Sequence, residues 1–488
     1  MLARRQFMAS GLTAATLHAA GPQGGQHPNV LFVIVDDLNC RIGPYGDPVA
    51  NTPNLDRLAA RGVRFDRAYC QYPLCNPTRS SVLSGRYPTQ TGVLDNNTLL
   101  VLEPGHESMP RHFANSGYEV AEFGKVWHGP NRGMRAGGAK PVQRNARTGV
   151  TVPWATPEER DRQRREEPDY WDRVHSPYRN LRLAHPEQYE WANKFGPLDD
   201  GDPGADARVA DQAIAAMKKF APGRKPFFLA AGFNKPHVPL MAPKKYFDMY
   251  DARAIPLPPD FETEAKPIEG MPPDEFRANI DLYAGRAFTT GEARQAMRAY
   301  YACVSYMDAQ LGRLLDTVDN LGLANDTIVV LWGDHGWHLS EKGMWAKGTL
   351  FETSARGPLL IADPRRTQGR VSARVVQYLD LFPTLVDLCG LNQAPWLSGT
   401  SLRPLLDRPD AEWTRPAYTV QTRGWALGRS VRTERWRYTE WDQGRRGSAL
   451  FDHDADPHEM RNLAQNPAQA QTVATLSKLL RQLPVRYS

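Results

Sequence analysis

The sequence predicts an α/β protein with a mostly parallel central sheet covered by helices on both faces, followed by a small C-terminal α+β unit. Short apolar runs alternate with helical patterns along most of the chain, which is typical of parallel strands joined by crossover helices. From Trp413 onward, short β-like segments replace that alternation. A length of 488 residues suffices for one large domain and one small domain.

The individual elements follow from these patterns. Near-continuous apolar runs, which favour buried strands, lie at residues 29–35, 118–123, 226–231, 327–332 and 358–361. Helical patterns lie between them at 54–61, 207–220 and 294–321. The C-terminal unit shows β-like pieces at 417–421 and 435–441 and a helical tail at 468–483. Because ligands bind beyond the carboxyl ends of parallel strands, the polar residues that follow these runs are the candidate site.

The first 25 residues predict an export signal. Arg4 and Arg5 precede Gln6 and Phe7, and a stretch of small, weakly apolar residues follows to Ala20. This order favours a twin-arginine signal, read by the twin-arginine translocase, over an amphipathic cytosolic N-terminus. The stretch is too short for a lasting membrane anchor. We therefore expect a periplasmic or secreted protein without a membrane anchor.

Composition excludes several classes of protein. The chain has 60 basic and 54 acidic residues, which gives a net charge of +6 spread thinly along the sequence. We therefore expect no nucleic-acid partner. Five cysteines are too few for a disulfide scaffold, and they are Cys40, Cys70, Cys75, Cys303 and Cys389. Cys303 and Cys389 have the setting of small buried hydrophobic residues.

Three regions are expected after these observations: the signal at 1–25, a catalytic domain at 26–412 and an α+β subdomain at 413–488. The catalytic domain carries a polar insertion at about 130–205, rich in Arg, Glu and Pro. Its aromatic residues either stack on sugar rings or form a small core of their own. They are Trp154, Trp171, Tyr178 and Trp191, with Arg173 and Arg179 nearby.

Carboxylates follow two of the predicted strands. Asp36 and Asp37 end the first run, and Asp334 and His335 follow the fourth. Brought together, three carboxylates suit a hard cation such as Ca²⁺ or Mg²⁺. His335 is either a ligand or a residue that orients one. The alternative is that these acidic residues cap helices or face water.

The segment from Cys75 to Arg86 contains a distinctive motif. Cys75, Pro77 and Arg79 are followed by a run of small residues and by Ser84-Gly85-Arg86. This pattern resembles the signature of the sulfatase family, in which the cysteine is oxidised to formylglycine. Further matching motifs are Thr52-Pro53-Asn54, Gly124-Lys125-Val126-Trp127-His128, Lys235-Pro236-His237, Asp334-His335-Gly336 with Lys347, and Asn462-Leu463-Ala464. The sequences of these motifs are most similar to those of iduronate-2-sulfatase-like members, although Ser340 stands where a glycine is usual.

The resemblance implies an alkaline-phosphatase/sulfatase-like fold and a set of site residues. It implies that a maturation enzyme converts Cys75 to formylglycine and that one Ca²⁺ lies among the carboxylates, His335 and residue 75. It further assigns Lys125 and Lys347 to sulfate contacts, His128 to the formylglycine hydrate and His237 to protonation of the leaving group. Arg79, one helical turn from Cys75, is placed to hold the hydrate.

Three functions remain open from the sequence. The leading hypothesis is hydrolysis of sulfate monoesters on a sulfated saccharide from its non-reducing end. A related phosphodiesterase or phosphonate monoester hydrolase would use the same modified cysteine. An inactive protein that binds sulfated glycans is the third, although a pure binder needs no nucleophile.

Overall fold

The computed structural model describes residues 27–129, 195–199, 201–223, 225–284, 286–345, 347–366, 369–424 and 426–484. The expected export signal at 1–25 and almost all of the insertion at about 130–205 lie outside these residues. None of the described helices combines the length and the apolar character that a membrane crossing requires.

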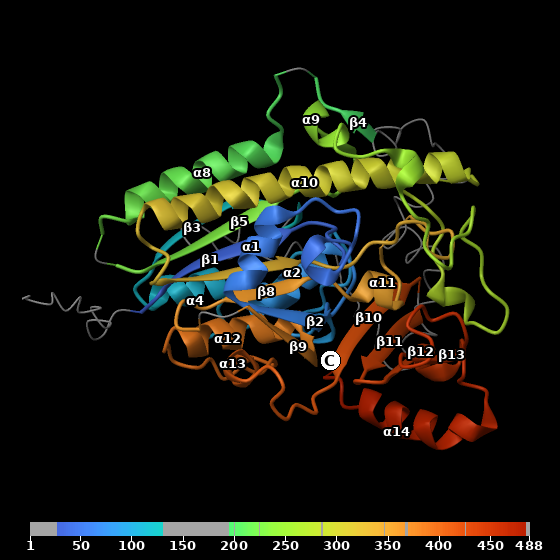
Figure 1. Ribbon diagram of the computed structural model, residues 1–488. Helices are drawn as coiled ribbons and strands as arrows, with labels where there is room; N and C mark the ends of the chain where they lie inside the picture. The colour runs from blue at the N-terminus through green and yellow to red at the C-terminus, as the bar shows by residue number, and fades with distance from the viewer. Residues whose placement is uncertain are drawn as a thin grey trace, which may run out of the picture.

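A seven-stranded central sheet has the strand order β3-β5-β1-β7-β8-β2-β9 (Figure 1). Its strands are β1 Asn29–Val35, β2 Val63–Tyr69, β3 Glu119–Gly124, β5 Phe227–Phe233, β7 Thr327–Gly333, β8 Leu359–Ala362 and β9 Arg370–Gln377. Neighbouring strands run parallel except where β8 pairs with β7 and β2. The expectation of a mostly parallel sheet is confirmed. A short pair, β4 Phe195–Pro197 and β6 Leu240–Ala242, lies apart from it.

Two strands, β2 and β9, were not expected from the sequence. Both lie at one side of the sheet, and β9 is its edge strand. Their side chains alternate between buried and partly exposed environments rather than forming continuous apolar runs. A search for fully buried strands therefore passes over them.

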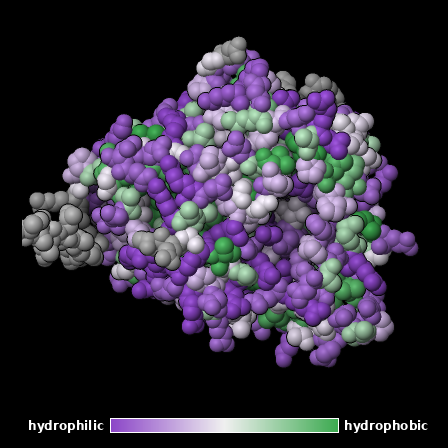
Figure 2. Space-filling view, in the orientation of Figure 1, coloured by the Kyte–Doolittle hydropathy of each residue, from purple (hydrophilic) through white to green (hydrophobic). Residues whose placement is uncertain are grey.

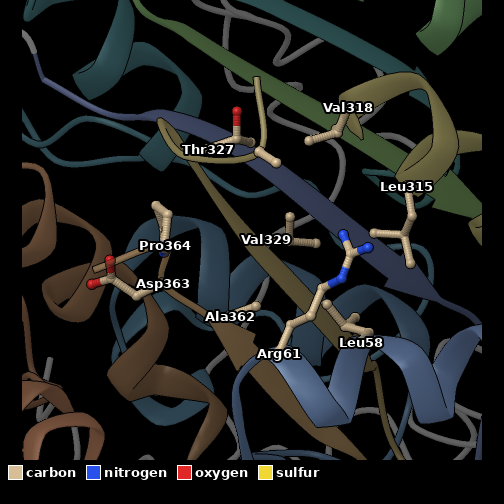
Figure 3. A pocket seen from close by; sticks show the side chains of 10 residues that line it. Leu58, Arg61, Leu315, Val318, Thr327, Val329, Ala362, Asp363 and Pro364 are labelled. Atoms are coloured by element: carbon tan, nitrogen blue, oxygen red, sulfur yellow. The ribbon is translucent and has the colours of Figure 1, made fainter. Parts of the chain in front are cut away.

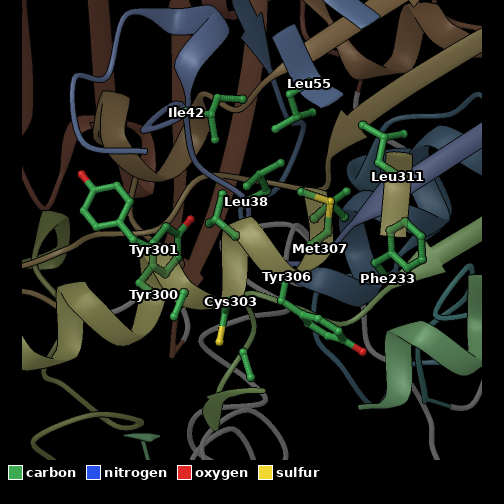
Figure 4. Packing of buried hydrophobic residues seen from close by; sticks show 14 of the residues in the cluster. Leu38, Ile42, Leu55, Phe233, Tyr300, Tyr301, Cys303, Tyr306, Met307 and Leu311 are labelled. Carbon is green, nitrogen blue, oxygen red and sulfur yellow. The ribbon is translucent and has the colours of Figure 1, made fainter. Parts of the chain in front are cut away.

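Helices cover both faces of the sheet, as expected (Figure 1). One face carries α1 Pro53–Arg61, α8 Ala205–Phe220 and α10 Thr290–Asn320, and the other carries α2 Cys75–Ser84, α4 Met109–Asn115 and α12 Leu381–Leu388. Successive residues of β1 alternate between the two cores, because side chains of a strand point to opposite faces. Leu31, Val33 and Val35 enter the core around α10, whereas Val30, Phe32 and Ile34 enter the core around α2 and α12. Figure 4 shows α10 residues such as Met307 and Leu311 packed near Leu38 and Leu55.

The C-terminal part contains a four-stranded antiparallel sheet with a helix against it. Its strands are β10 Ala417–Arg423, β11 Ala426–Arg432, β12 Trp436–Trp441 and β13 Ser448–Asp452, and the helix is α14 Ala470–Leu480. The expected α+β character is confirmed. Fully buried Arg437 joins this sheet to the main body, because it donates to Glu352 at 2.5 Å. It also donates to Glu459 of the C-terminal part at 2.6 Å. Short α-helices in the described residues are α3 Pro88–Thr91, α9 Lys244–Phe247, α11 Glu352–Ala355 and α13 Arg403–Asp407.

A small cavity lies where β7 begins, lined by residues that include Arg61, Thr327 and Asp363 (Figure 3). β7 has seven residues, from Thr327 to Gly333, so Gly333 lies at the opposite end of the strand from the cavity. At about 3.3 Å per residue, roughly 20 Å separates the cavity from the residues that follow the strand. The candidate site at the carboxyl end therefore does not include it.

Ser340 adopts a backbone conformation that favours glycine. Its φ is +75°, a region that costs a side-chain-bearing residue roughly 1–2 kcal/mol. Its buried hydroxyl has no hydrogen-bond partner in the described part of the chain. The structure thus gives a physical reason for the glycine that the resemblance leads one to expect at this position.

Replacing Ser340 with glycine is expected to raise the free energy of unfolding by about 1 kcal/mol. Relief of backbone strain and removal of the unsatisfied hydroxyl outweigh the entropy that glycine gains in the unfolded chain, roughly 0.5–1 kcal/mol. Urea unfolding measures the change. The Ser340→Ala variant removes the hydroxyl but keeps the Cβ atom. A larger gain in alanine than in glycine would contradict the strain argument.

Candidate active site

The carboxylates predicted at two strand ends do lie together. Val35 at the end of β1 pairs with Gly333 at the end of β7, so that Asp36 and Asp37 emerge beside Asp334. The Asp37 amide donates to Asp334 Oδ1 at 3.0 Å. All three carboxyl groups are buried. Burial of three acidic groups in one place requires cations nearby.

Asp37 holds a strained conformation within this group. Its φ is +60°, which is uncommon outside glycine, although aspartate tolerates it better than most residues. Tyr300 of α10 fixes the segment, because its hydroxyl donates to the Asp37 carbonyl at 2.8 Å and accepts from the Asn39 amide at 2.9 Å. Such strain persists where the surrounding structure enforces it, which is common at functional sites.

Helix α2 begins at Cys75 and brings Arg79 under the carboxylates. Every residue of this helix is buried. Arg79 Nε donates to Asp334 Oδ2 at 3.0 Å, and Nη2 donates to Asp36 Oδ1 at 3.3 Å. Arg79 Nη1 also donates to the Lys125 carbonyl. Arg79 therefore links two carboxylates to the loop after β3, and its contact with a modified residue 75 stays a prediction.

Two lysines complete the buried charge cluster. Lys125 follows Gly124, where φ is +67° and a Cβ atom would lie 2.2 Å from the Gly232 carbonyl oxygen, so the turn there requires glycine. Lys125 Nζ donates to Asp36 Oδ2. Lys347 Nζ lies 2.5 Å from Asp37 Oδ1 and 3.2 Å from Cys75 Sγ.

The lysines change the protonation of the cysteine. Burial by itself would raise the pKa of the Cys75 thiol, but Lys125 and Lys347 outweigh it and hold the pKa well below its usual value. Burial likewise opposes the charged form of Asp36, yet Lys125, His237 and Arg79 keep its pKa low. The position of residue 75 therefore favours a negatively charged side-chain atom.

The two predicted histidines differ in their environments. His237 Nε2 lies 3.9 Å from Asp37 Oδ2 and 4.0 Å from Asp36 Oδ2. Burial and the lysines disfavour its charged form, but the two carboxylates raise its pKa overall. Burial lowers the pKa of His128. Both imidazoles interact with the Cys75 side chain. Beside this one side chain, His237 favours the protonated form and His128 favours the neutral form.

The cluster has ligand atoms suited to a metal ion. Asp36, Asp37, Cys75 and His335 each offer one atom, all within 4.8 Å of one another. Among the described residues, Asp37 Oδ2 and His335 Nε2 are buried without a hydrogen-bond partner. His335 Nδ1 lies 2.9 Å from the Gly336 carbonyl; donation there leaves the Nε2 lone pair facing the cluster.

Asp334 differs from the other predicted ligands. Its Oδ1 and Oδ2 already accept hydrogen bonds from the Asp37 amide and from Arg79.

Burial opposes a charged His335, but Asp334 and Cys75 raise the pKa of this imidazole to about 9. A cation in the cluster would compete with that proton. The residues present therefore fit a bound cation.

Sequence reasoning gave no role to two neighbours of the site. One is Tyr300, and the other is Trp337, whose ring centroid lies 5.3 Å from Lys347 Nζ. Tyr300 lies inside a helical apolar pattern. The clue in the sequence was its hydroxyl, because a buried tyrosine hydroxyl needs a hydrogen-bond partner. Trp337 follows Asp334 by three residues. The aromatic and basic residues of the insertion considered for substrate contacts lie outside the described residues; they are Trp154, Trp171, Tyr178, Trp191, Arg173 and Arg179.

Comparison with known proteins places this geometry in a family. The family model described as sulfatase matches residues 28–391, and a model described as the C-terminal region of N-sulphoglucosamine sulphohydrolase matches residues 340–486. A sulfatase from Formosa agariphila is 33% identical over 473 residues, which cover 93% of this chain and 86% of that protein. Iduronate 2-sulfatase from Homo sapiens is 32% identical over 411 residues, covering 75% of this chain and 70% of that protein.

The same fold occurs in a solved structure of a different hydrolase. Phosphonate monoester hydrolase from Silicibacter pomeroyi superposes with a TM-score of 0.70 at 23% identity, covering 93% of this chain and 94% of that one. This likeness shows the shared alkaline-phosphatase/sulfatase-like architecture alone. The family match spans the whole charge cluster and the motif at Cys75. The chain therefore belongs to the sulfatase family and is an enzyme of the sulfuric ester hydrolase class.

Proposed function

We propose that this enzyme removes sulfate from a sulfated saccharide, using a formylglycine at position 75 and a calcium ion. The observation that carries the proposal is the contact of Cys75 Sγ with Lys347 Nζ at 3.2 Å, inside a buried cluster that also holds Asp36 and Asp37. A structural cysteine has no need of a charged environment, whereas a nucleophile does.

The modification would occur before the enzyme becomes active. A maturation enzyme would oxidise the Cys75 side chain to an aldehyde, and the twin-arginine translocase would export the chain to the periplasm or beyond. As a hydrate, the aldehyde supplies one hydroxyl to attack sulfur and a second whose deprotonation releases sulfate. Position 75 suits this group because the thiol already favours the anionic form there.

Calcium would be held by Asp36, Asp37, His335 and the side chain of residue 75, with Asp334 supporting Asp37. The donor set is dominated by carboxylates, which favours a hard cation. When bound, the cation would supply positive charge for the sulfate oxygens and favour the ionised hydroxyl of residue 75.

The surrounding side chains have complementary roles in this proposal. Lys125 and Lys347 would bind the sulfate oxygens as fixed positive charges. His237, whose pKa is raised by two carboxylates, would donate a proton to the leaving oxygen of the substrate. Burial lowers the pKa of His128. In its neutral form, the His128 imidazole would accept a proton from the hydrate. Arg79 would keep Asp36 and Asp334 in place.

Two alternatives remain as outcomes of the test. The fold of phosphonate monoester hydrolase keeps that activity under consideration, and a protein that only binds sulfated glycans is the other. Support for a saccharide sulfate comes from the identity with iduronate 2-sulfatase over 75% of this chain.

The deciding experiment compares purified enzyme on four substrates: 2-O-sulfated uronic-acid oligosaccharides, 6-O-sulfated hexosamines, an aryl sulfate and an aryl phosphonate monoester. We expect kcat/KM to be highest for one of the saccharides. A higher value for the aryl sulfate than for either saccharide would overturn the saccharide proposal. Preference for the phosphonate would favour the hydrolase alternative, and tight binding of oligosaccharides without turnover would favour the binding protein.

A further inference from the structure

Two loops carry the residues that would hold a cation, and neither of them is a helix or a strand at those residues. One loop follows β1 and contains Asp36 and Asp37, and the other follows β7 and contains Asp334 and His335. A loop fixes its side chains less precisely than a helix or a strand does. Side chains outside the ligand set must therefore hold these two loops in place.

Tyr300 of α10 holds the loop after β1. Leu38, which lies between Asp37 and Asn39, packs in the same buried cluster as Tyr300 (Figure 4). The Tyr300 hydroxyl bonds to the backbone on both sides of Leu38, because it donates to the Asp37 carbonyl at 2.8 Å and accepts from the Asn39 amide at 2.9 Å. Burial raises the pKa of Tyr300 well above its usual value, so the hydroxyl keeps the proton that it donates.

Asn39 extends this contact to the loop after β7. Its side chain is buried, its Nδ2 donates to the Trp337 carbonyl at 3.0 Å, and its Oδ1 accepts from the Arg41 amide at 3.0 Å. The two loops also approach closely, since a Cβ atom at Gly333 would lie 2.5 Å from the Leu38 carbonyl oxygen. Asn39 therefore couples the position of one loop to that of the other.

Trp337 returns the chain of contacts to Asp37. The centroid of its buried ring lies 5.3 Å from Lys347 Nζ, within the range of a cation–π interaction. Lys347 Nζ in turn lies 2.5 Å from Asp37 Oδ1. The contacts form a closed ring that holds both the backbone and the carboxylate of Asp37; its members are Asp37, Tyr300, Asn39, Trp337 and Lys347.

An outer contact joins the same two loops independently of Tyr300. Arg41 Nη2 donates to Glu341 Oε1 at 2.6 Å, and Glu341 Oε2 accepts from the Leu339 amide at 2.5 Å. Loss of the Tyr300 hydroxyl should therefore loosen Asp37 without separating the loops.

We propose that Tyr300 and Asn39 are positioning residues that hold Asp37 in the conformation in which its carboxylate binds the cation of the active site. The inference rests on the proposed function, which places a cation beside Asp37. In the described part of the chain, Asp37 Oδ2 is buried without a hydrogen-bond partner and is open to such an ion. Residues that orient metal ligands in this way change metal affinity without touching the metal.

The test measures the affinity of chelator-treated enzyme for Ca²⁺ by calorimetric titration, which requires no turnover. Tyr300→Phe keeps the ring and removes the hydroxyl that the Asp37 carbonyl and the Asn39 amide share. Asn39→Ala removes the link to the Trp337 carbonyl. We expect the Kd for Ca²⁺ to rise roughly 10- to 100-fold in each variant. If Tyr300→Phe does not fold, Asn39→Ala carries the same test.

The matched control is Tyr306→Phe on the same helix. Tyr306 is also buried, and its hydroxyl makes the same pair of bonds, because it donates to the Pro203 carbonyl at 2.7 Å and accepts from the Ala207 amide at 2.9 Å. Urea unfolding in chelator should show similar losses of stability in Tyr300→Phe and Tyr306→Phe, whereas Tyr306→Phe should keep the wild-type Kd. Equal weakening of Ca²⁺ binding in both variants would assign the effect to general loosening of α10 and overturn the positioning role.

Sulfate release at two Ca²⁺ concentrations provides a second measurement. At limiting Ca²⁺, Tyr300→Phe should be at least roughly tenfold slower than wild type, and saturating Ca²⁺ should restore most of its kcat, because the variant loses occupancy of the site and keeps its catalytic groups. The same fractional loss at both concentrations would contradict a role through the cation.

The outcomes separate this inference from the proposed function. If wild type binds Ca²⁺ and both Tyr300→Phe and Asn39→Ala keep its Kd, the positioning role fails while the proposed function stands. If wild type binds Ca²⁺ but releases no sulfate from any substrate, the proposed function fails, and weaker binding in the two variants still supports the positioning role. A wild-type enzyme that releases sulfate but binds no Ca²⁺ would remove the calcium ion from the proposed function and overturn the positioning role with it.

Discussion

Replacing Cys75 with alanine is expected to abolish sulfate release while the enzyme remains folded. Loss of a covalent nucleophile lowers kcat by at least roughly 10⁴-fold, as seen where the other catalytic groups cannot substitute for it. The Cys75 side chain is small and is fully buried at the start of α2, so alanine leaves only a small gap. Initial rates of sulfate release from the best saccharide substrate measure the loss.

The same experiment requires a direct test of the modification. Mass spectrometry of the wild-type peptide that contains Cys75 should show a fraction with the thiol replaced by an aldehyde, and activity should scale with that fraction. Circular dichroism of Cys75→Ala provides the control for folding. Two results would contradict the formylglycine mechanism. One is activity of the alanine variant within tenfold of wild type, and the other is full activity of an enzyme preparation in which residue 75 is present only as the thiol.

The sequence predicted that three carboxylates lie together, but it did not predict the order of the strands. Asp36, Asp37 and Asp334 follow strands whose apolar runs are continuous, and adjacent parallel strands bring their carboxyl ends together. That physical rule places the carboxylates without any knowledge of the strand order. The order itself, with antiparallel β8 between β7 and β2, depends on connections that local patterns do not encode.

Other features depend on contacts between distant residues. Tyr300 and Asp37 are separated by 263 positions, and nothing near Tyr300 in the sequence indicates where its hydroxyl points. Among the described residues, the surface also lacks an obvious binding region on the face that Figure 2 shows. Hydrophilic side chains cover most of this face, and apolar ones lie in small separate groups (Figure 2). Composition therefore does not locate a binding site.

Replacing Asp37 with asparagine is expected to remove the response of the enzyme to calcium and to lower kcat/KM by at least roughly 10²-fold. Asparagine keeps the size of the side chain and tolerates the φ of +60°. The change removes the charge that Asp37 Oδ2 offers to a cation and leaves Lys347 without its 2.5 Å carboxylate contact. In the wild type, a ligand present at 100 times its Kd stabilises the folded state by about 2.7 kcal/mol.

Thermal unfolding with added Ca²⁺ and with chelator measures this response without using activity. Wild type should show a higher Tm with Ca²⁺, and Asp37→Asn should show the same Tm under both conditions. Asp308→Asn is the matched control, because Asp308 is also buried but caps α1 through the Leu55 amide at 2.7 Å. This variant should lose stability yet keep the calcium response. If wild type keeps full activity and an unchanged Tm after the chelator is added, or holds zinc by elemental analysis, calcium is not the ion of this site. Since Asp36, Asp37 and His335 belong to one cluster with residue 75, the cation and the nucleophile would then have to be reconsidered together.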